Sequence, residues 1–138
     1  MNLYDAEKIL SDAGVDDAEF ECRILAERFL HIPMSRSAYM KTEQLDSMPD
    51  FGEFVRALEK RATRYPLQYI MGEWEFYGLR MKVNENCLIP RPDTELVAER
   101  AITELKKMPK KAEFRCVDLC TGSGCIAAAV MSHVKNAS

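Results

Sequence analysis

The chain has 138 residues, of which 47% are hydrophobic and 30% charged, and its 19 basic and 22 acidic side chains give a net charge of −3. This composition is typical of a soluble globular protein with one ordinary domain or two small ones. Because there is no basic surplus, a protein that binds nucleic acid mainly through its phosphates is not favoured.

Neither a signal segment nor a membrane span is visible in the sequence. The cysteines are odd in number, and their spacing does not form a disulfide framework. Three of them, Cys116, Cys120 and Cys125, lie close together, but zinc sites usually contain pairs separated by two residues and these are farther apart. We therefore expect a cytoplasmic protein with free thiols and no metal site.

Residues 1–65 are predicted to form helices only. Hydrophobic residues recur at helical spacing in three segments, with a shorter helix expected between the second and third. The segments are Ala6–Ala13, Ala18–Phe29 and Phe51–Ala62, and the shorter helix includes Ser35–Met40. Amphipathic helices on short connections bury their apolar faces against each other, so this part is predicted to be a small bundle.

A β-hairpin is predicted within residues 66–90. Trp74 and Phe76 alternate with polar residues before Tyr77-Gly78, and a second alternating run follows this turn. From residue 91 onward the pattern changes again. It predicts a helix that includes Leu96–Leu105, a strand over residues 114–119, a glycine turn, and a helix over Ile126–Val134.

The glycine turn is the segment most closely tied to chemistry. It follows the predicted strand as the run Asp118–Gly124, and its glycines would let a ligand approach the backbone closely. A phosphate-binding loop requires a lysine that is missing here, and a dinucleotide fingerprint requires a third glycine. A tight strand-to-helix turn without any ligand is the remaining structural interpretation.

The same run resembles the first motif of class I methyltransferases, whose ligand is S-adenosylmethionine. Three segments precede it in a fixed order, namely Pro66–Gly72, Glu75–Gly78 and Leu88–Glu95. This succession resembles the HemK/PrmC family, which methylates the glutamine of the Gly-Gly-Gln loop in peptide-chain release factors. The resemblance covers essentially the whole chain and is specific from Pro66 to Gly124.

The resemblance implies an α+β chain in three parts. Residues 1–65 would be an all-α bundle that docks the protein substrate, and residues 66–90 a β-hairpin linker. Residues 91–138 would begin a Rossmann-like α/β methyltransferase domain. The implied partners are release factors, with no direct contact to nucleic acid or membrane.

The resemblance also implies a cofactor site for S-adenosylmethionine. Its expected residues are Asp118, Cys120, Thr121, Gly122, Ser123 and Gly124, with Leu88, Arg91 and Pro92 at its border. An ion pair with Asp93 or Glu95 is the alternative for Arg91, and plain packing is the alternative for Leu88 and Pro92. Cys120 stands where the family usually has glycine, and a left-handed backbone there would cost about 1 kcal/mol.

The family's Asn-Pro-Pro-Tyr motif, which holds the substrate amide, and the acidic residue that grips the ribose would both lie beyond Ser138. Because catalysis depends on positioning the amide against the methyl donor, the chain alone is expected to be inactive. Two other functions stay open: an amino-group methyltransferase that acts on nucleic acid, and a truncated binding module that engages a partner without catalysis.

Overall fold

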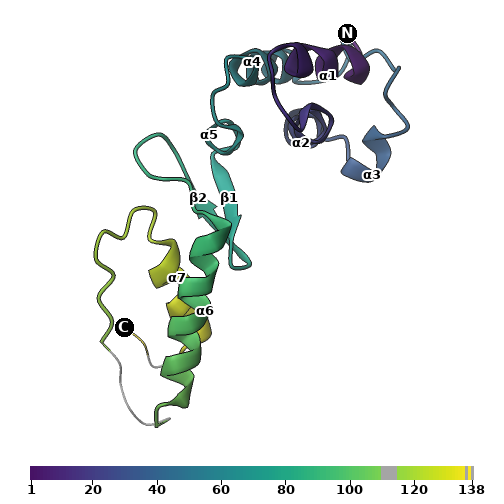
Figure 1. The fold of residues 1–138 in the computed structure, drawn as a ribbon. Coiled ribbons are helices and arrows are strands. Elements are labelled where there is room, and N and C mark those ends of the chain that lie inside the picture. Colours follow the sequence, from purple (N-terminus) through teal and green to yellow (C-terminus); the bar gives the residue numbers. More distant parts are fainter. Residues whose placement is uncertain (110–114, 136, 138) are drawn as a thin grey trace. The chain divides into compact units, whose positions relative to one another are not determined.

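The computed structural model describes residues 1–109, 115–135 and 137. The chain divides into two compact units, Met1–Met71 and Gly72–Ser138 (Figure 1). The described residues are mostly helical, with one two-stranded antiparallel hairpin, so the predicted α+β class is confirmed at this level. In the described part of the chain, no helix is long and apolar enough to cross a membrane.

The first unit is all helical, as the sequence predicts. Its helices are α1 (Leu3–Asp12), α2 (Ala18–Leu30), α3 (Met34–Ser37), α4 (Phe51–Ala62) and α5 (Leu67–Met71). The start of α1 is held by a capping box, in which Asn2 and Asp5 each accept a hydrogen bond from the other's backbone N–H. The first unit extends past residue 65 because Leu67 of α5 is buried in the same core as the bundle.

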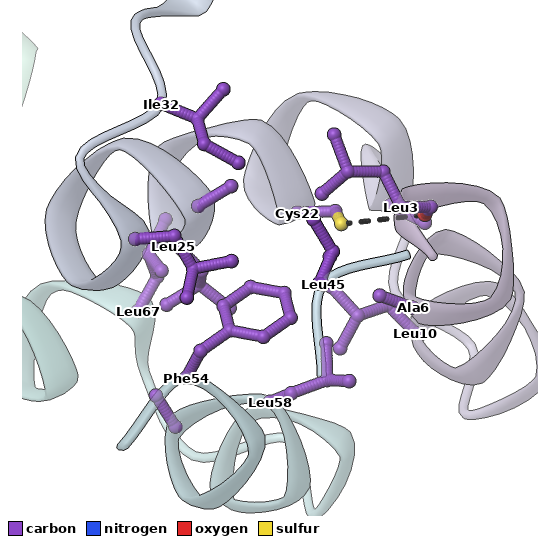
Figure 2. Close-up of a cluster of buried hydrophobic side chains, with 14 of the residues drawn as sticks. Leu3, Ala6, Leu10, Cys22, Leu25, Ile32, Leu45, Phe54, Leu58 and Leu67 are labelled. Atoms are coloured by element: carbon purple, nitrogen blue, oxygen red, sulfur yellow. Dashed lines mark hydrogen bonds between the residues drawn. The ribbon is translucent and has the colours of Figure 1, made fainter. Parts of the chain in front are cut away.

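The core of the bundle is built around Phe54 of α4, which is fully buried (Figure 2). Leu25 of α2 and Leu58 of α4 belong to the same cluster, together with Leu45 from the segment that precedes α4. The Cys22 thiol donates to the Leu3 carbonyl at 3.7 Å, and burial raises the pKa of this thiol to about 12. The apolar faces predicted on α2 and α4 therefore pack against each other in this core.

A half-buried ion pair joins two helices of the bundle. Arg61 of α4 contacts both carboxylate oxygens of Glu21 on α2 and also donates to the Tyr65 carbonyl at 3.3 Å. The hydrogen bond to Glu21 is the main reason that the pKa of Arg61 is raised above its usual value. Such a bidentate pair adds geometric specificity to the contact between the two helices, because the guanidinium fork has a fixed geometry.

The second unit begins with the predicted hairpin. Strand β1 (Glu73–Phe76) pairs antiparallel with β2 (Leu79–Lys82), and Phe76 faces Leu79 next to the turn. Both turn residues, Tyr77 and Gly78, have positive φ angles of 51° and 73°. This geometry is that of a type I′ turn, whose twist matches the twist of the paired strands.

Two helices complete the described part of the second unit. They are α6 (Pro92–Lys107) and α7 (Cys125–His133), and they pack against each other (Figure 1). Phe76 is 1% exposed and belongs to a cluster with Ala98 of α6 and with Cys125 and Ala129 of α7. Phe76 therefore anchors the hairpin to α6 and α7.

The strand predicted over residues 114–119 is not formed by its described residues. Residues 115–118 have no regular structure, and Phe114 lies outside the described residues. A parallel strand requires hydrogen-bonding neighbours, but in the described part of the chain β1 and β2 pair only with each other. Val117 and Leu119 are consequently each 81% exposed. The predicted start of a Rossmann-like sheet is therefore absent from the described residues.

Candidate functional site

The glycine loop that precedes α7 is closed by two hydrogen bonds. The Thr121 hydroxyl donates to a carboxylate oxygen of Asp118 at 2.9 Å, and the Gly124 N–H donates to the Thr121 carbonyl at 2.8 Å. Thr121 therefore connects the segment before the loop to Gly124, the residue that precedes α7. Three of the predicted cofactor residues are joined directly in this way.

The backbone of the loop turns through three left-handed positions. Cys120, Gly122 and Gly124 have φ angles of 59°, 56° and 76°. A Cβ atom added at Gly122 or Gly124 would have its nearest neighbour at 3.9 Å, so there is space for a side chain. The glycines are required by the backbone conformation rather than by crowding.

Cys120, which stands where the family usually has glycine, adopts a left-handed conformation. An L-residue with a Cβ atom pays about 1–2 kcal/mol there relative to the right-handed region. Its side chain is exposed, so no burial in the described part of the chain compensates that cost.

The chemistry of the loop suits a cationic ligand that requires close contact with the backbone. Asp118 is half-buried and supplies a carboxylate beside the loop, while a Cβ at Gly122 or Gly124 would make only an ordinary van der Waals contact at 3.9 Å. A carboxylate attracts an ammonium group, and glycines without side chains let a ligand approach the main chain. These residues fit the amino-acid portion of S-adenosylmethionine.

An apolar cavity of about 180 Å³ lies beside the loop. The side chains around it come from α6, from α7 and from the segment before the loop. They are Ala101, Leu105, Cys116, Val117, Asp118, Ile126, Ala127, Val130 and Met131. The cavity thus brings the carboxylate of Asp118 together with a hydrophobic surface formed by two helices.

The three border residues, Leu88, Arg91 and Pro92, do not adopt the structural roles that were the alternatives to cofactor binding. Leu88 is 69% exposed and Pro92 is also exposed, so packing beneath the loop does not explain either of them. Arg91 precedes α6, and among the described residues it forms no ion pair with Asp93 or Glu95. None of the three border residues lines the cavity beside the loop. Their cofactor role stays a prediction.

Glu95 has a structural role that the sequence did not reveal. One of its carboxylate oxygens accepts the backbone N–H of Tyr77 at 2.8 Å, which ties the hairpin turn to the first turn of α6. The Tyr77 ring also contacts the His133 ring edge-to-face, with 5.0 Å between the ring centroids. The type I′ turn is therefore held by α6 through Glu95 and by α7 through His133.

Comparison with known proteins agrees with this architecture. Residues 3–72 match the family model described as the PrmC N-terminal domain. The chain therefore belongs to the HemK/PrmC family and corresponds to the N-terminal part of its members.

Several curated relatives carry the name release factor glutamine methyltransferase. The protein of Thermodesulfovibrio yellowstonii is 37% identical over 84% of this chain and 42% of its own length. That of Flavobacterium psychrophilum is 36% identical over 81% of this chain and 42% of its own length. That of Deinococcus radiodurans is 32% identical over 98% of this chain and 47% of its own length. The chain thus spans less than half the length of these relatives.

Proposed function

We propose that this chain is the front portion of an S-adenosylmethionine-dependent methyltransferase that modifies the glutamine side-chain amide of peptide-chain release factors. The observation that carries the proposal is the family match over residues 3–72, together with relatives named for this activity, one of which aligns over 98% of the chain. The closed loop with its Asp118–Thr121 hydrogen bond supports the same proposal from the side of the cofactor.

The described residues would contribute cofactor binding. S-adenosylmethionine, when bound, supplies a methyl group on a sulfonium that an amide nitrogen can attack. Asp118 would hold the ammonium group of the ligand, and Thr121 would orient Asp118 through the hydrogen bond between them. Gly122 and Gly124 would bring the backbone against the ligand, because neither carries a side chain in the way.

The helical bundle would contribute to docking of the protein substrate, and the chain alone would not complete the reaction. The 138 residues contain no Asn-Pro-Pro-Tyr segment to hold the substrate amide. Positioning of the nucleophile against the methyl donor supplies much of the rate enhancement in group transfer, so its loss removes turnover even where the cofactor still binds.

A methyl-transfer assay tests the proposal. The complete protein encoded by the reading frame that contains this sequence is incubated with methyl-labelled S-adenosylmethionine and purified release factor. Label on the glutamine of the Gly-Gly-Gln loop is the expected result, and the 138-residue chain assayed in parallel should transfer none. An Asp118→Asn variant of the complete protein should lose affinity for the cofactor, whereas Asp93→Asn serves as a charge-matched control on the exposed start of α6.

Two other results would contradict the proposal. Label in RNA or DNA, with none in the release factor, would identify an amino-group methyltransferase that acts on nucleic acid. Binding of release factor by the complete protein without any transfer of label would identify a non-catalytic binding module.

A further inference from the structure

The first unit carries a surface groove of about 280 Å³. None of the residues that line it belongs to the glycine loop. Its apolar lining comes from three helices of the bundle: Phe29 of α2, Ala57 of α4 and Ile70 of α5. Phe29 and Ile70 are half-buried and belong to the edge of the bundle core. The groove therefore offers a small hydrophobic surface that is continuous with the core.

Cationic side chains border this apolar surface. Arg56 and Lys60 line the groove from consecutive turns of α4, and Arg28 stacks over the Phe29 ring with 5.8 Å from its guanidinium carbon to the ring centroid. Glu53 is the single carboxylate among the described residues that line the groove. The two cations and one carboxylate that line the groove give it a local charge of +1, in a chain whose net charge is −3.

These cations are not neutralised within the described part of the chain. Lys60 lies 4.0 Å from the centroid of the Tyr65 ring, and such a contact orients the ammonium without cancelling its charge. Neither Lys60 nor Arg28 forms an ion pair with a described residue. Arg56 approaches Glu53 at 3.9 Å, but both side chains are largely exposed, so solvent weakens this pair. An incoming carboxylate would therefore meet available positive charge.

We propose that this groove binds an acidic segment of a partner protein. One apolar side chain of the segment would lie against Phe29, Ala57 and Ile70, and carboxylates on either side of it would face Arg56 and Lys60. Complementary charge speeds the encounter of the two proteins and fixes the position of the segment along the groove. The apolar contact forms the centre of the interface, from which water is excluded. The inference deepens the docking role proposed for the bundle and depends on that proposal only for the identity of the partner.

A second copy of the chain is the competing occupant. The turn between α1 and α2 and the start of α2 carry Asp16, Asp17 and Glu19, and the neighbouring Phe20 is 55% exposed. However, Glu19 is already paired with Lys41 at 2.7 Å, and this pairing holds the pKa of Glu19 below its usual value. Part of that acidic surface is therefore neutralised within its own chain, which favours a separate partner.

A titration followed by NMR tests the inference with defined probes. The ¹⁵N-labelled 138-residue chain is titrated with a capped Glu-Glu-Leu-Glu-Glu peptide, with its Lys-Lys-Leu-Lys-Lys counterpart, and with Glu-Glu-Ser-Glu-Glu. The acidic leucine peptide should shift the amide resonances of Ala57, Lys60 and Ile70 and should lose affinity as salt is added. The lysine peptide should leave these resonances in place, and the serine peptide should bind more weakly.

Charge-reversal variants locate the site. Lys60→Glu and, independently, Arg56→Glu should each weaken binding of the acidic peptide by about threefold to tenfold, as expected for one contact at a partly exposed position. Lys8→Glu is the matched control, because Lys8 is exposed on α1 outside the groove and the change in net charge is the same. Circular dichroism of each variant confirms that the bundle is folded.

Three results would overturn the inference: shifts confined to other residues, equal weakening by Lys8→Glu and Lys60→Glu, or no shifts at millimolar peptide. Self-association that Lys60→Glu reduces in sedimentation equilibrium would assign the groove to a second copy instead. If the acidic peptide binds in the groove and purified release factor does not, the groove is a binding site for acidic segments, but the release factor is not the partner that it binds. The two proposals can thus be distinguished.

Discussion

Replacement of Glu95 tests whether the hydrogen bond between α6 and the hairpin stabilises the second unit. The Tyr77 N–H donates to the Glu95 carboxylate at 2.8 Å, and Tyr77 is held at a left-handed φ of 51°. A hydrogen bond to a charged acceptor contributes about 1.5–3 kcal/mol, and both residues are only half-buried, which places this one at the lower end. Glu95→Ala should therefore lower the free energy of unfolding of this unit by about 1.5 kcal/mol.

The measurement uses the single tryptophan, Trp74 of β1, which reports unfolding of the second unit in urea by its fluorescence. Asp93→Ala is the matched control, because Asp93 also lies in the first turn of α6. Its replacement removes the same negative charge from the N-terminal end of the helix dipole. Glu95→Gln keeps an acceptor oxygen and should fall between the two. Equal losses for Glu95→Ala and Asp93→Ala would refute the reasoning, since the dipole alone would then explain the effect.

Phe54→Ala should destabilise the bundle by about 3–5 kcal/mol, because a fully buried ring leaves a cavity; loss of helical circular dichroism at lower urea checks this. Cys116 and Cys120 should react with a thiol reagent in the native protein, whereas buried Cys22 and Cys125 should react only after unfolding. Folding raises the pKa of the Cys22 thiol to about 12 from an ordinary 9.0, so the stabilisation from keeping this thiol neutral is complete below pH 9. The free energy of unfolding should therefore decline as pH rises from 9 toward 12, and the Cys22→Ala variant should lack this part of the decline. Cys120→Gly should relieve the left-handed strain and slow hydrogen exchange of the loop amides by up to about fivefold.

The described residues of the second unit expose several large apolar side chains. Leu96 and Val97 of α6 and Met131 of α7 are each more than half exposed. In the described residues of this unit the hydrophobic clusters are small, and they are centred on Phe76 and on Ile102. This distribution agrees with the proposed role as the opening part of a larger methyltransferase domain.

Much of the local structure could be predicted from the sequence because it depends on short-range patterns. The apolar spacing on α2 and α4 identified the faces that meet around Phe54, and the alternation around Tyr77-Gly78 identified the hairpin. The glycine loop and the segments before it also indicated the family, since these residues are contiguous in the chain. The positive φ angles at Gly122 and Gly124 are local properties of the same kind.

Only the tertiary structure decided the features that depend on residues distant in the sequence. Glu95 accepts from Tyr77 because the hairpin folds back on α6, and the groove exists because α2, α4 and α5 converge. The segment over residues 114–119 resembles a strand by its sequence, yet its described residues form none, because a strand is completed by hydrogen bonds to neighbours and not by its own residues. Helices satisfy their own backbone and can be predicted from a segment alone, whereas a sheet requires the rest of the fold.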